Sequence, residues 1–356
     1  MKLVMTLLVR DEADVIRANL DFHLQAGVDH VIVMDHGSVD ETPAILEEYV
    51  GRGVVDLIRE PAGPFRQREW MTRMARLAAT RHGADWVINS DADEFWWPRG
   101  GSLKEVLGQI PHRYGIVQSF VRHFVPVAGS SEPFFERMVY RLSPQAAIHD
   151  PTSPWRPFRK VVHRAAADSV VTEGAHALMG SDLQTLRGWY PIEVLHFPIR
   201  SSGQLARKGA VWSFAQAKYF GDEAPPSGPG AAYHALAYQA SERGASEEYF
   251  DSLVVREDAL DDAVAAGILH VDTRLCDALR LVVDGRLPVF PRPSVVEDAL
   301  FAVDVAALGE ADVIRTGRHL GDLEQRLSAL ERTLPARIER RLRRLARAVR
   351  SRGAPS

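Results

Sequence analysis

Apolar and polar positions alternate with two different periods along the first hundred residues. Four short apolar runs are typical of strands, and they cover residues 2–9, 30–35, 54–60 and 85–95. Three segments between them carry apolar residues at helical spacing, and these are 11–27, 38–53 and 67–83. Repeated strand and helix units of this length predict a mostly parallel sheet covered by helices, with ligands bound beyond the carboxyl ends of its strands.

The pattern changes beyond residue 115. Shorter strand-like runs separated by turns follow, and they predict a mixed sheet that forms the second wall of a site. From about 203 to 300 helical patterns dominate, interrupted by a Pro- and Gly-rich stretch at 221–230. We expect that stretch to be a loop that can close over a bound ligand.

The C-terminal tail has two leucine-rich parts. Leucines at steps of 3, 4, 3 and 4 predict a coiled-coil seam that Pro335 interrupts, and they are Leu320, Leu323, Leu327, Leu330 and Leu334. Residues 336–353 then form an apolar stripe among many arginines. This pattern leaves open a solvated or homo-oligomeric helix, or a peripheral contact with an anionic membrane or an acidic partner.

Composition narrows the classes of protein. Hydrophobic residues make up 46% of the chain and charged residues 25%, as in globular proteins. The net charge of -4 gives no overall electrostatic attraction to nucleic acid. Cys276 is the single cysteine, which excludes an intramolecular disulfide and a thiolate metal cage. The first apolar run is too short for a signal peptide, and no run approaches 18 apolar residues. We therefore expect no membrane span and a cytoplasmic location, including the inner face of the membrane.

The stretch "WVINSDADEFWWP" at 86–98 carries the clearest candidate chemistry. In strand-like backbone Asp91 and Asp93 project to the same side, where two unpaired carboxylates would repel each other. A hard divalent cation such as Mg²⁺ or Mn²⁺, placed between them and a diphosphate, would balance these charges. Glu94 points the other way by alternation, and we expect it to be a structural partner of a buried arginine or a backbone amide.

Three motifs follow one another in register, "DE" at 11–12, "DHGSVDET" at 35–42 and "DAD" at 91–93. Together they make residues 3–98 resemble the nucleotide-binding half of glycosyltransferase family 2 and its relatives of GT-A fold. The later segment "VLHFPIRSSGQLARK" at 194–208 resembles the H-x-x-x-R-S segment of the family-92-like branch. The resemblance implies an α/β, GT-A-type three-layer sandwich with a mostly parallel sheet, followed by a helical C-terminal region.

The resemblance also implies a domain organisation. A glycosyltransferase domain at 1–215 would contain a nucleotide-binding half at 1–110 and an acceptor and catalytic half at 111–215. A helical extension at 216–310 and the tail at 311–356 would follow.

A metal-dependent reaction follows from the same resemblance. With Mn²⁺ or Mg²⁺, the enzyme would move one sugar from a nucleotide diphosphate sugar, of UDP or GDP type, to an acceptor hydroxyl. The acceptor could be a carbohydrate, a lipid-linked molecule or a small molecule. The resemblance implies inverting transfer. Non-processive transfer is expected because the Q-x-x-R-W motif and the membrane helices of processive family-2 synthases are missing.

Roles carried over from the resemblance define the candidate site. Donor-binding positions are Val9, Arg10, Glu12, Asp35, His36, Ser38, Arg68, Asp91 and Lys208. Expected metal ligands are Asp91, Asp93 and His196, with His176 and His163 as competitors for the histidine. Asp150 and Glu173 are alternative catalytic bases, and Asp40 is expected to cap the helix that follows it. Three rings could form the floor of the acceptor site or pack in the core, namely Phe95, Trp96 and Trp97.

Three other functions use similar elements. A nucleotidyltransferase making nucleotide sugars would show a glycine-rich phosphate loop after the first strand, whereas "RDEADV" at 10–15 contains no glycine. A non-catalytic binding protein would keep the fold with a degenerate donor pocket, against which the intact "DAD" speaks. Metal-dependent phosphoester hydrolysis would need the His and Asp clusters of a two-metal site.

Overall fold

The computed structural model describes residues 1–63, 65–128, 133–150, 153–179, 182–209 and 231–352. Its chain divides into two compact units, Met1–Ala307 and Leu308–Ser356. The loop expected at 221–230 lies outside the described residues. The expected domain boundary at 215/216 stays a prediction.

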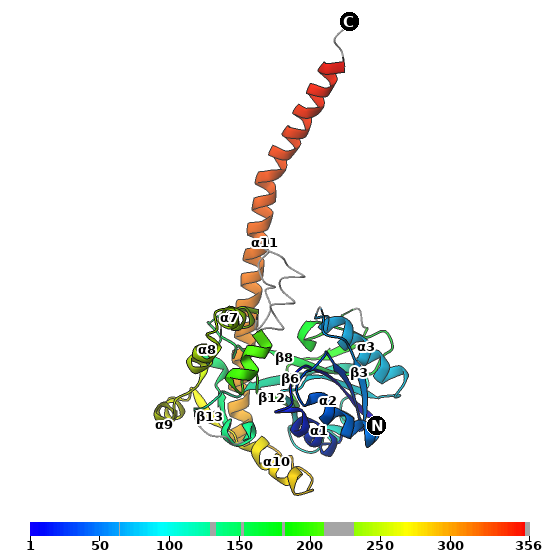
Figure 1. The fold of residues 1–356 in the computed structure, drawn as a ribbon, viewed down its shortest axis with the longest axis vertical. Coiled ribbons are helices and arrows are strands. Elements are labelled where there is room, and N and C mark those ends of the chain that lie inside the picture. The colour runs from blue at the N-terminus through cyan, green and yellow to red at the C-terminus, as the bar shows by residue number, and fades with distance from the viewer. Residues whose placement is uncertain (64, 129–132, 151–152, 180–181, 210–230, 353–356) are drawn as a thin grey trace. The chain divides into compact units, whose positions relative to one another are not determined.

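The first hundred residues form the predicted strand and helix units (Figure 1). β1 (Leu3–Val9) lies between β2 (His30–Asp35) and β4 (Trp86–Asp91), and β3 (Val55–Arg59) continues beyond β2, all in parallel. α1 (Ile16–Gln25) and α2 (Thr42–Gly51) pack on one face of this sheet, and α3 (Gln67–Thr80) packs on the other. The expected α/β fold with three layers and a mostly parallel sheet is confirmed.

The remaining strands extend the same sheet in the order β3-β2-β1-β4-β8-β6-β12-β5. β8 (Arg159–Arg164) runs antiparallel to β4 and to β6 (Tyr114–His123), while β12 (Ile192–His196) runs parallel to β6. The mixed second half is thus confirmed. β11 (Gln184–Leu186) also pairs with β6. Two separate two-stranded sheets are formed by β9 (Val170–Val171) with β10 (Leu178–Met179), and by β7 (Tyr140–Leu142) with β13 (Leu269–Val271).

Helices surround and follow this sheet. The short ones are α4 (Leu103–Gly108), α5 (Phe134–Arg137), η1 (Pro144–Ala146) and η2 (Glu173–Ala175). Those of the helical region are α7 (Ala231–Glu242), α8 (Ser246–Leu253), α9 (Glu257–Ala265), α10 (Arg274–Val283) and α11 (Val295–Arg352). The expected helical C-terminal region is therefore confirmed.

The fourth predicted strand is divided in two. β4 ends at Asp91, the chain turns through residues 92–93, and β5 (Glu94–Pro98) leaves to pair antiparallel with β12. The alternation that predicted Asp91 and Asp93 on the same side does not apply here, because it holds only within a continuous strand.

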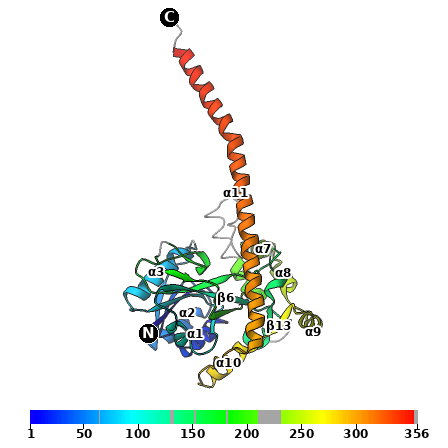
Figure 2. The ribbon, with the colours of Figure 1, turned by 180° about the vertical axis from the view of Figure 1, so that it is seen from behind.

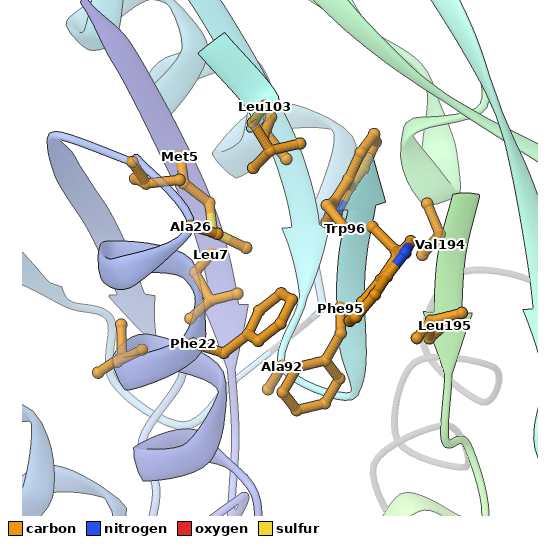
Figure 3. Packing of buried hydrophobic residues seen from close by; sticks show 14 of the residues in the cluster. Met5, Leu7, Phe22, Ala26, Ala92, Phe95, Trp96, Leu103, Val194 and Leu195 are labelled. Atoms are coloured by element: carbon orange, nitrogen blue, oxygen red, sulfur yellow. The ribbon is translucent and has the colours of Figure 1, made fainter. Parts of the chain in front are cut away.

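The three rings of β5 lie in the core. Phe95 and Trp96 are fully buried and Trp97 is 4% exposed, and Figure 3 shows Phe95 beside Phe22 of α1. The Phe22 and Phe95 ring centroids are 5.5 Å apart at a steep angle, and Phe22 also stacks on Trp97 at 6.1 Å. The core-packing alternative is confirmed, and a sugar-binding floor at these rings is wrong because no face of them is open to a ligand.

α11 is one continuous helix over Val295–Arg352, as Figure 2 also shows. The interruption expected at Pro335 is wrong. A proline inside a helix removes one backbone donor, and the turns on either side can persist. The seam leucines Leu320, Leu323 and Leu327 are 54%, 40% and 57% exposed. Among the described residues, no helix is both long and apolar enough to cross a membrane.

Candidate functional site

The site lies where the parallel strands end. Val9 at the end of β1 is in register with Asp35 at the end of β2, and the neighbouring Leu8 is in register with Asp91 at the end of β4. The last residues of three adjacent strands therefore meet at one edge of the sheet, where open α/β sheets bind ligands. The first and second sequence motifs and the start of the third reach this edge together.

A hydrogen-bonded turn follows β2. Oγ of Ser38 donates to Oδ1 of Asp35 at 2.5 Å, and it accepts from the backbone N–H of Asp11 at 2.9 Å. The backbone N–H of Val39 donates to Oδ1 of Asp11 at 2.7 Å. Gly37 has a φ of 66°, and a Cβ on it would lie 2.7 Å from the backbone nitrogen of Ala62. The turn thus requires glycine there and is held in place before any ligand binds.

Asp40 fixes the start of α2. Its Oδ1 accepts from the backbone N–H of Thr42 at 2.9 Å, and its Oδ2 accepts from the backbone N–H of Ala13 at 3.1 Å. The capping role expected from the sequence is confirmed. The same carboxylate also ties the segment after β1 to α2.

His36 is covered by aromatic rings. It is 1% exposed, and its ring centroid is 4.6 Å from that of Trp70 and 5.9 Å from that of Phe65. Burial and the charge of Arg10 lower the pKa of His36, so the ring is neutral. Within the described residues, neither ring nitrogen has a hydrogen-bond partner of good geometry. A contact of His36 with a nucleotide base stays a prediction.

A buried lysine joins the first and last acids of the "DADE" turn. Nζ of Lys160, on β8, is 2.6 Å from Oδ2 of Asp91 and 2.6 Å from Oε1 of Glu94. Burial and the charges of Asp91 and Asp93 raise the pKa of Glu94 to about 8, against the opposing effect of Lys160. Glu94 also accepts from the backbone N–H of Asp91 at 3.1 Å. The expected structural role of Glu94 is confirmed, because it accepts a hydrogen bond from a backbone amide. Its buried cation is Lys160, whereas an arginine was expected.

Two side chains of α1 bind the backbone of the turn between β4 and β5. The side-chain amide of Asn19 donates to the backbone oxygens of Ala92 at 2.9 Å and Glu94 at 2.8 Å. Nε2 of His23 accepts from the backbone N–H of Trp96 at 3.0 Å, which requires that its Nδ1 carries the proton. Burial lowers the pKa of His23 to about 4, so it stays neutral. The position of the turn is therefore determined by neutral, fully bonded side chains.

Asp93 sits among cations and a histidine. Its side chain is 3% exposed, and its Oδ2 is 2.5 Å from Nζ of Lys208 and 3.7 Å from a guanidinium nitrogen of Arg200. Its Oδ1 is 3.6 Å from Nε2 of His196. Burial alone would raise the pKa of Asp93, but the charges of Lys208 and Arg200 lower it well below its usual range. Asp93 is an ionised carboxylate at neutral pH.

The protonation of His196 follows from its neighbours. Nε2 of His123 is 3.1 Å from the backbone oxygen of Arg156, which can only accept, so this nitrogen donates. Burial lowers the pKa of His123 to about 4 and that of His196 well below its ordinary value, so both rings are neutral. Nδ1 of His123 must then accept from Nδ1 of His196 at 3.1 Å. His196 is left with a lone pair on Nε2, facing the carboxylate of Asp93.

Such a pair fits a divalent cation. Two Lewis bases face each other without a proton between them, and a ligating histidine is ordinarily oriented by a hydrogen bond from its other nitrogen. Asp91 is not part of the pair, because its Oδ2 binds Lys160 and its Oδ1 is 3.4 Å from the amide of Gln67. In the described part of the chain, the three expected ligands Asp91, Asp93 and His196 do not form one compact ligand group. A shared contact of both aspartates with one ion stays a prediction.

Arg200 organises the acids behind Asp93. It is 1% exposed and binds Glu12 through its guanidinium, with Oδ2 of Asp14 at 2.7 Å. It also donates to the backbone oxygen of Phe197 at 3.0 Å. Arg200 therefore binds Glu12, and Nζ of Lys208 is 3.8 Å from Oε1 of the same carboxylate. The H-x-x-x-R-S spacing was the sequence signal for Arg200, which was not among the expected site residues.

The competing histidines lie elsewhere. Nδ1 of His176 is bonded to the backbone oxygen of Arg159 at 2.9 Å, and the ring of Phe158 contacts both His176 and His196. His163 is in register with Val87, four residues before the end of β4. His196, and neither of these two, has a described contact with Asp93, and the alternatives stay predictions.

Several other expected positions lie on different parts of the described chain. Glu173 is exposed and lies against the first turn of α3, where burial raises its pKa and the charge and backbone of Arg68 oppose that rise. Arg68 is exposed, and Asp150 is exposed beyond η1. The backbone oxygen of Val9 accepts from His36 at 3.0 Å, and Arg10 lies 3.8 Å from Asp11. Their roles at the site stay predictions.

Comparison with known families agrees with this picture. The model of Glycosyltransferase family 92 matches residues 5–177, which include all three sequence motifs but neither His196 nor Lys208. The match covers just under half of the chain, and it supports the expected class of enzyme, a glycosyltransferase, and the family-92 part of the expected resemblance. Placement in family 2 stays a prediction. No curated protein matches the chain.

Solved structures show distant similarity. Glucosyl-3-phosphoglycerate synthase from Mycobacterium tuberculosis, in complex with Mn²⁺, UDP and glucosyl-3-phosphoglycerate, is 22% identical over 34% of this chain and 44% of its own, with a TM-score of 0.25. TarS 1–349 from S. aureus in complex with UDP is 13% identical over 89% of this chain and 92% of its own, with a TM-score of 0.34. TarS 1–349 in complex with UDP-GlcNAc is 12% identical over 80% of this chain and 93% of its own, with a TM-score of 0.36. The chain thus spans less than half of the mycobacterial synthase, and similarity at this level transfers no substrate or metal.

Proposed function

We propose that the protein transfers one sugar from a nucleotide diphosphate sugar to an acceptor hydroxyl, with a divalent cation held by Asp93 and His196. The observation that carries this proposal is the neutral imidazole nitrogen of His196 facing an ionised carboxylate at 3.6 Å. When bound, Mn²⁺ or Mg²⁺ would stabilise the charge on the departing diphosphate. The proposal assigns Asp91 to the donor's ribose, with Lys160 and Gln67 fixing its carboxylate.

Charge at the site supports binding of a diphosphate. Lys208 is 25% exposed, and burial is outweighed by Asp93 and Glu12, which raise its pKa. Its ammonium group therefore stays charged and can contact a diphosphate from its position on Asp93. Arg200 is fully enclosed by Glu12, Asp14 and Asp93, so it holds the acids in place and cannot reach a ligand.

The acceptor's proton requires a carboxylate base. Inverting transfer would place that base in the second half of the domain, and Asp150 and Glu173 are the two candidates. The raised pKa of Glu173 brings it nearer to neutral pH, as general-base catalysis favours. Non-processive transfer agrees with the missing Q-x-x-R-W motif.

Thermal unfolding with a panel of UDP, GDP, dTDP and CDP tests the binding half of this proposal. With Mn²⁺, one nucleotide should stabilise the wild type, by about 2.7 kcal/mol at a hundredfold excess over its Kd. The shift should need Mn²⁺ and should disappear in Asp93→Asn. The matched control Asp284→Asn changes an exposed aspartate at the end of α10 and should retain the shift.

A shift that is independent of metal, or that survives in Asp93→Asn, would contradict the proposed cation site. Release of nucleoside diphosphate from the matching sugar donor then tests catalysis. Release in the wild type and not in Asp93→Asn is the expected result. Binding without any release would favour the non-catalytic alternative.

A further inference from the structure

A second group of potential metal ligands lies at the opposite end of the parallel strands. His30 is the first residue of β2, Asp56 is the second residue of β3, and His82 follows α3. Asp35, at the donor end of β2, is five residues beyond His30, which corresponds to roughly 17 Å of strand. The group is therefore separate from the candidate donor site.

Both histidines direct the same ring nitrogen to one carboxylate. Nε2 of His30 is 3.1 Å from Oδ1 of Asp56, and Nε2 of His82 is 3.1 Å from Oδ2. The two imidazole rings stack with centroids 4.4 Å apart and an interplanar angle of 25°. One ligand atom from each of the three residues lies within 4.8 Å of the other two. Among the described residues, no other three side chains of His, Cys, Asp or Glu come this close together.

These distances suit a small transition-metal ion. Bonds of about 2.0–2.2 Å to nitrogen and oxygen place neighbouring ligand atoms of a tetrahedral ion roughly 3.3 Å apart. The contact of His30 lacks hydrogen-bond geometry although its Nε2 is buried, so that nitrogen has no protein partner of good geometry among the described residues. Side chains that are 14%, 27% and 11% exposed leave room for a water molecule as a fourth ligand.

The surrounding charges set the limits of the site. A guanidinium nitrogen of Arg81 is 3.4 Å from Oδ2 of Asp56, but its side chain is 68% exposed and can turn into solvent. His30, His82 and Asp56 together offer two imidazole nitrogens and one carboxylate oxygen.

We propose that His30, Asp56 and His82 bind a transition-metal ion of the Zn²⁺ class at the amino ends of β2 and β3. Imidazole and carboxylate ligands in this combination suit Zn²⁺ and Co²⁺ better than Mg²⁺. The ion would link the connection after α3 to β2 and to the edge strand β3, far from the donor. This site does not depend on the proposed function.

Titration of the full chain, without a polyhistidine tag, with Co²⁺ and then Zn²⁺ tests the proposal. Visible absorption reports tetrahedral Co²⁺, and Zn²⁺ should displace it. The chain should bind one equivalent of metal ion. His82→Gln and Asp56→Asn should each weaken binding by at least about tenfold, because removing a ligand costs more than removing a group that only orients a ligand. The control His112→Gln changes an exposed histidine and should bind as the wild type does.

Two results would overturn the proposal. One is the absence of saturable Co²⁺ or Zn²⁺ binding, and the other is equal affinity in the wild type, His82→Gln and Asp56→Asn. Circular dichroism verifies that each variant folds, and His30→Gln replaces any that does not. Asp93→Asn should retain the binding, which separates this site from the candidate donor site.

Discussion

His123 and His196 contact each other through their Nδ1 atoms at 3.1 Å, and this contact determines which nitrogen of His196 faces Asp93. The backbone oxygen of Arg156 fixes the proton of His123 on Nε2, and the order of donors and acceptors follows from there. Two buried neutral rings thereby direct a lone pair to a carboxylate. Orientation of a ligand by a second histidine is an arrangement that metal sites use.

Replacing His123 by Phe should weaken the proposed metal site without removing a ligand. The aromatic ring keeps its volume beside Phe158 and Trp155, but Nδ1 of His196 loses its acceptor. We expect Mn²⁺ affinity in the presence of the matching nucleotide to fall roughly 10- to 100-fold. Isothermal titration measures it, and unchanged affinity would show that the histidine pair does not orient a ligand.

Lys160 should be essential for stability. At about pH 9, above the pKa of about 8 for Glu94, Lys160→Met leaves this carboxylate buried and without its cation, which costs about 3–5 kcal/mol when a buried pair is broken on one side. The double variant Lys160→Met with Glu94→Gln should recover part of this loss, because it removes the buried negative charge. Urea unfolding gives both values. Equal stability of the single and double variants would argue against the pairing of these two residues.

His163 makes stability depend on pH. Burial lowers its pKa to about 4, whereas an unfolded chain has a value of about 6.5. Above about pH 6.5 both states are neutral and the contribution is complete. As the pH falls toward 4 the unfolded state takes up the proton first, so the contribution is lost.

Substituting His163 by Leu should therefore reduce the loss of stability between about pH 7 and about pH 4.5 by up to roughly 3 kcal/mol. His112→Leu, at an exposed position, should leave this loss unchanged. Urea unfolding at both pH values provides the comparison. A slope that is identical in wild type and His163→Leu would mean that the buried ring already takes up a proton in the folded state.

Trp97 should contribute to stability and not to acceptor binding. It is 4% exposed and packs on Phe22 and on Phe290, whose ring centroid is 4.9 Å away. Trp97→Ala should lower the free energy of unfolding by about 3–5 kcal/mol. In the folded variant, KM for the acceptor should be unchanged, and a selective rise in that KM would support the sugar-floor interpretation instead.

The sequence was sufficient for the parallel half of the fold. Periodicity located β1 to β4 and the helices between them, and the capping role of Asp40 followed from its position. It failed at the turn after Asp91, because residues 92–93 contain no glycine or proline to mark a reversal between the two strands. It also failed at Pro335, where the surrounding helix outweighs the loss of one backbone donor.

The candidate site was only partly predictable. Asp93, His196 and Lys208 come together as their motifs suggested. No sequence motif marks Lys160 or His123. These residues reach the site through the pairing of β8 with β6, and the two strands are distant in sequence from the motifs. Long-range strand order, rather than local pattern, decides which charged residues neutralise the acids.

The most direct test of the proposed cation site is pulsed electron paramagnetic resonance of bound Mn²⁺ with the matching nucleoside diphosphate. Electron spin-echo envelope modulation detects a nitrogen bonded directly to Mn²⁺, and a His82→Gln background removes the second histidine site. The wild-type donor site should show one imidazole nitrogen, and His196→Gln should abolish the signal. Bound Mn²⁺ without nitrogen coupling, or with coupling that survives in His196→Gln, would contradict a cation held by Asp93 and His196.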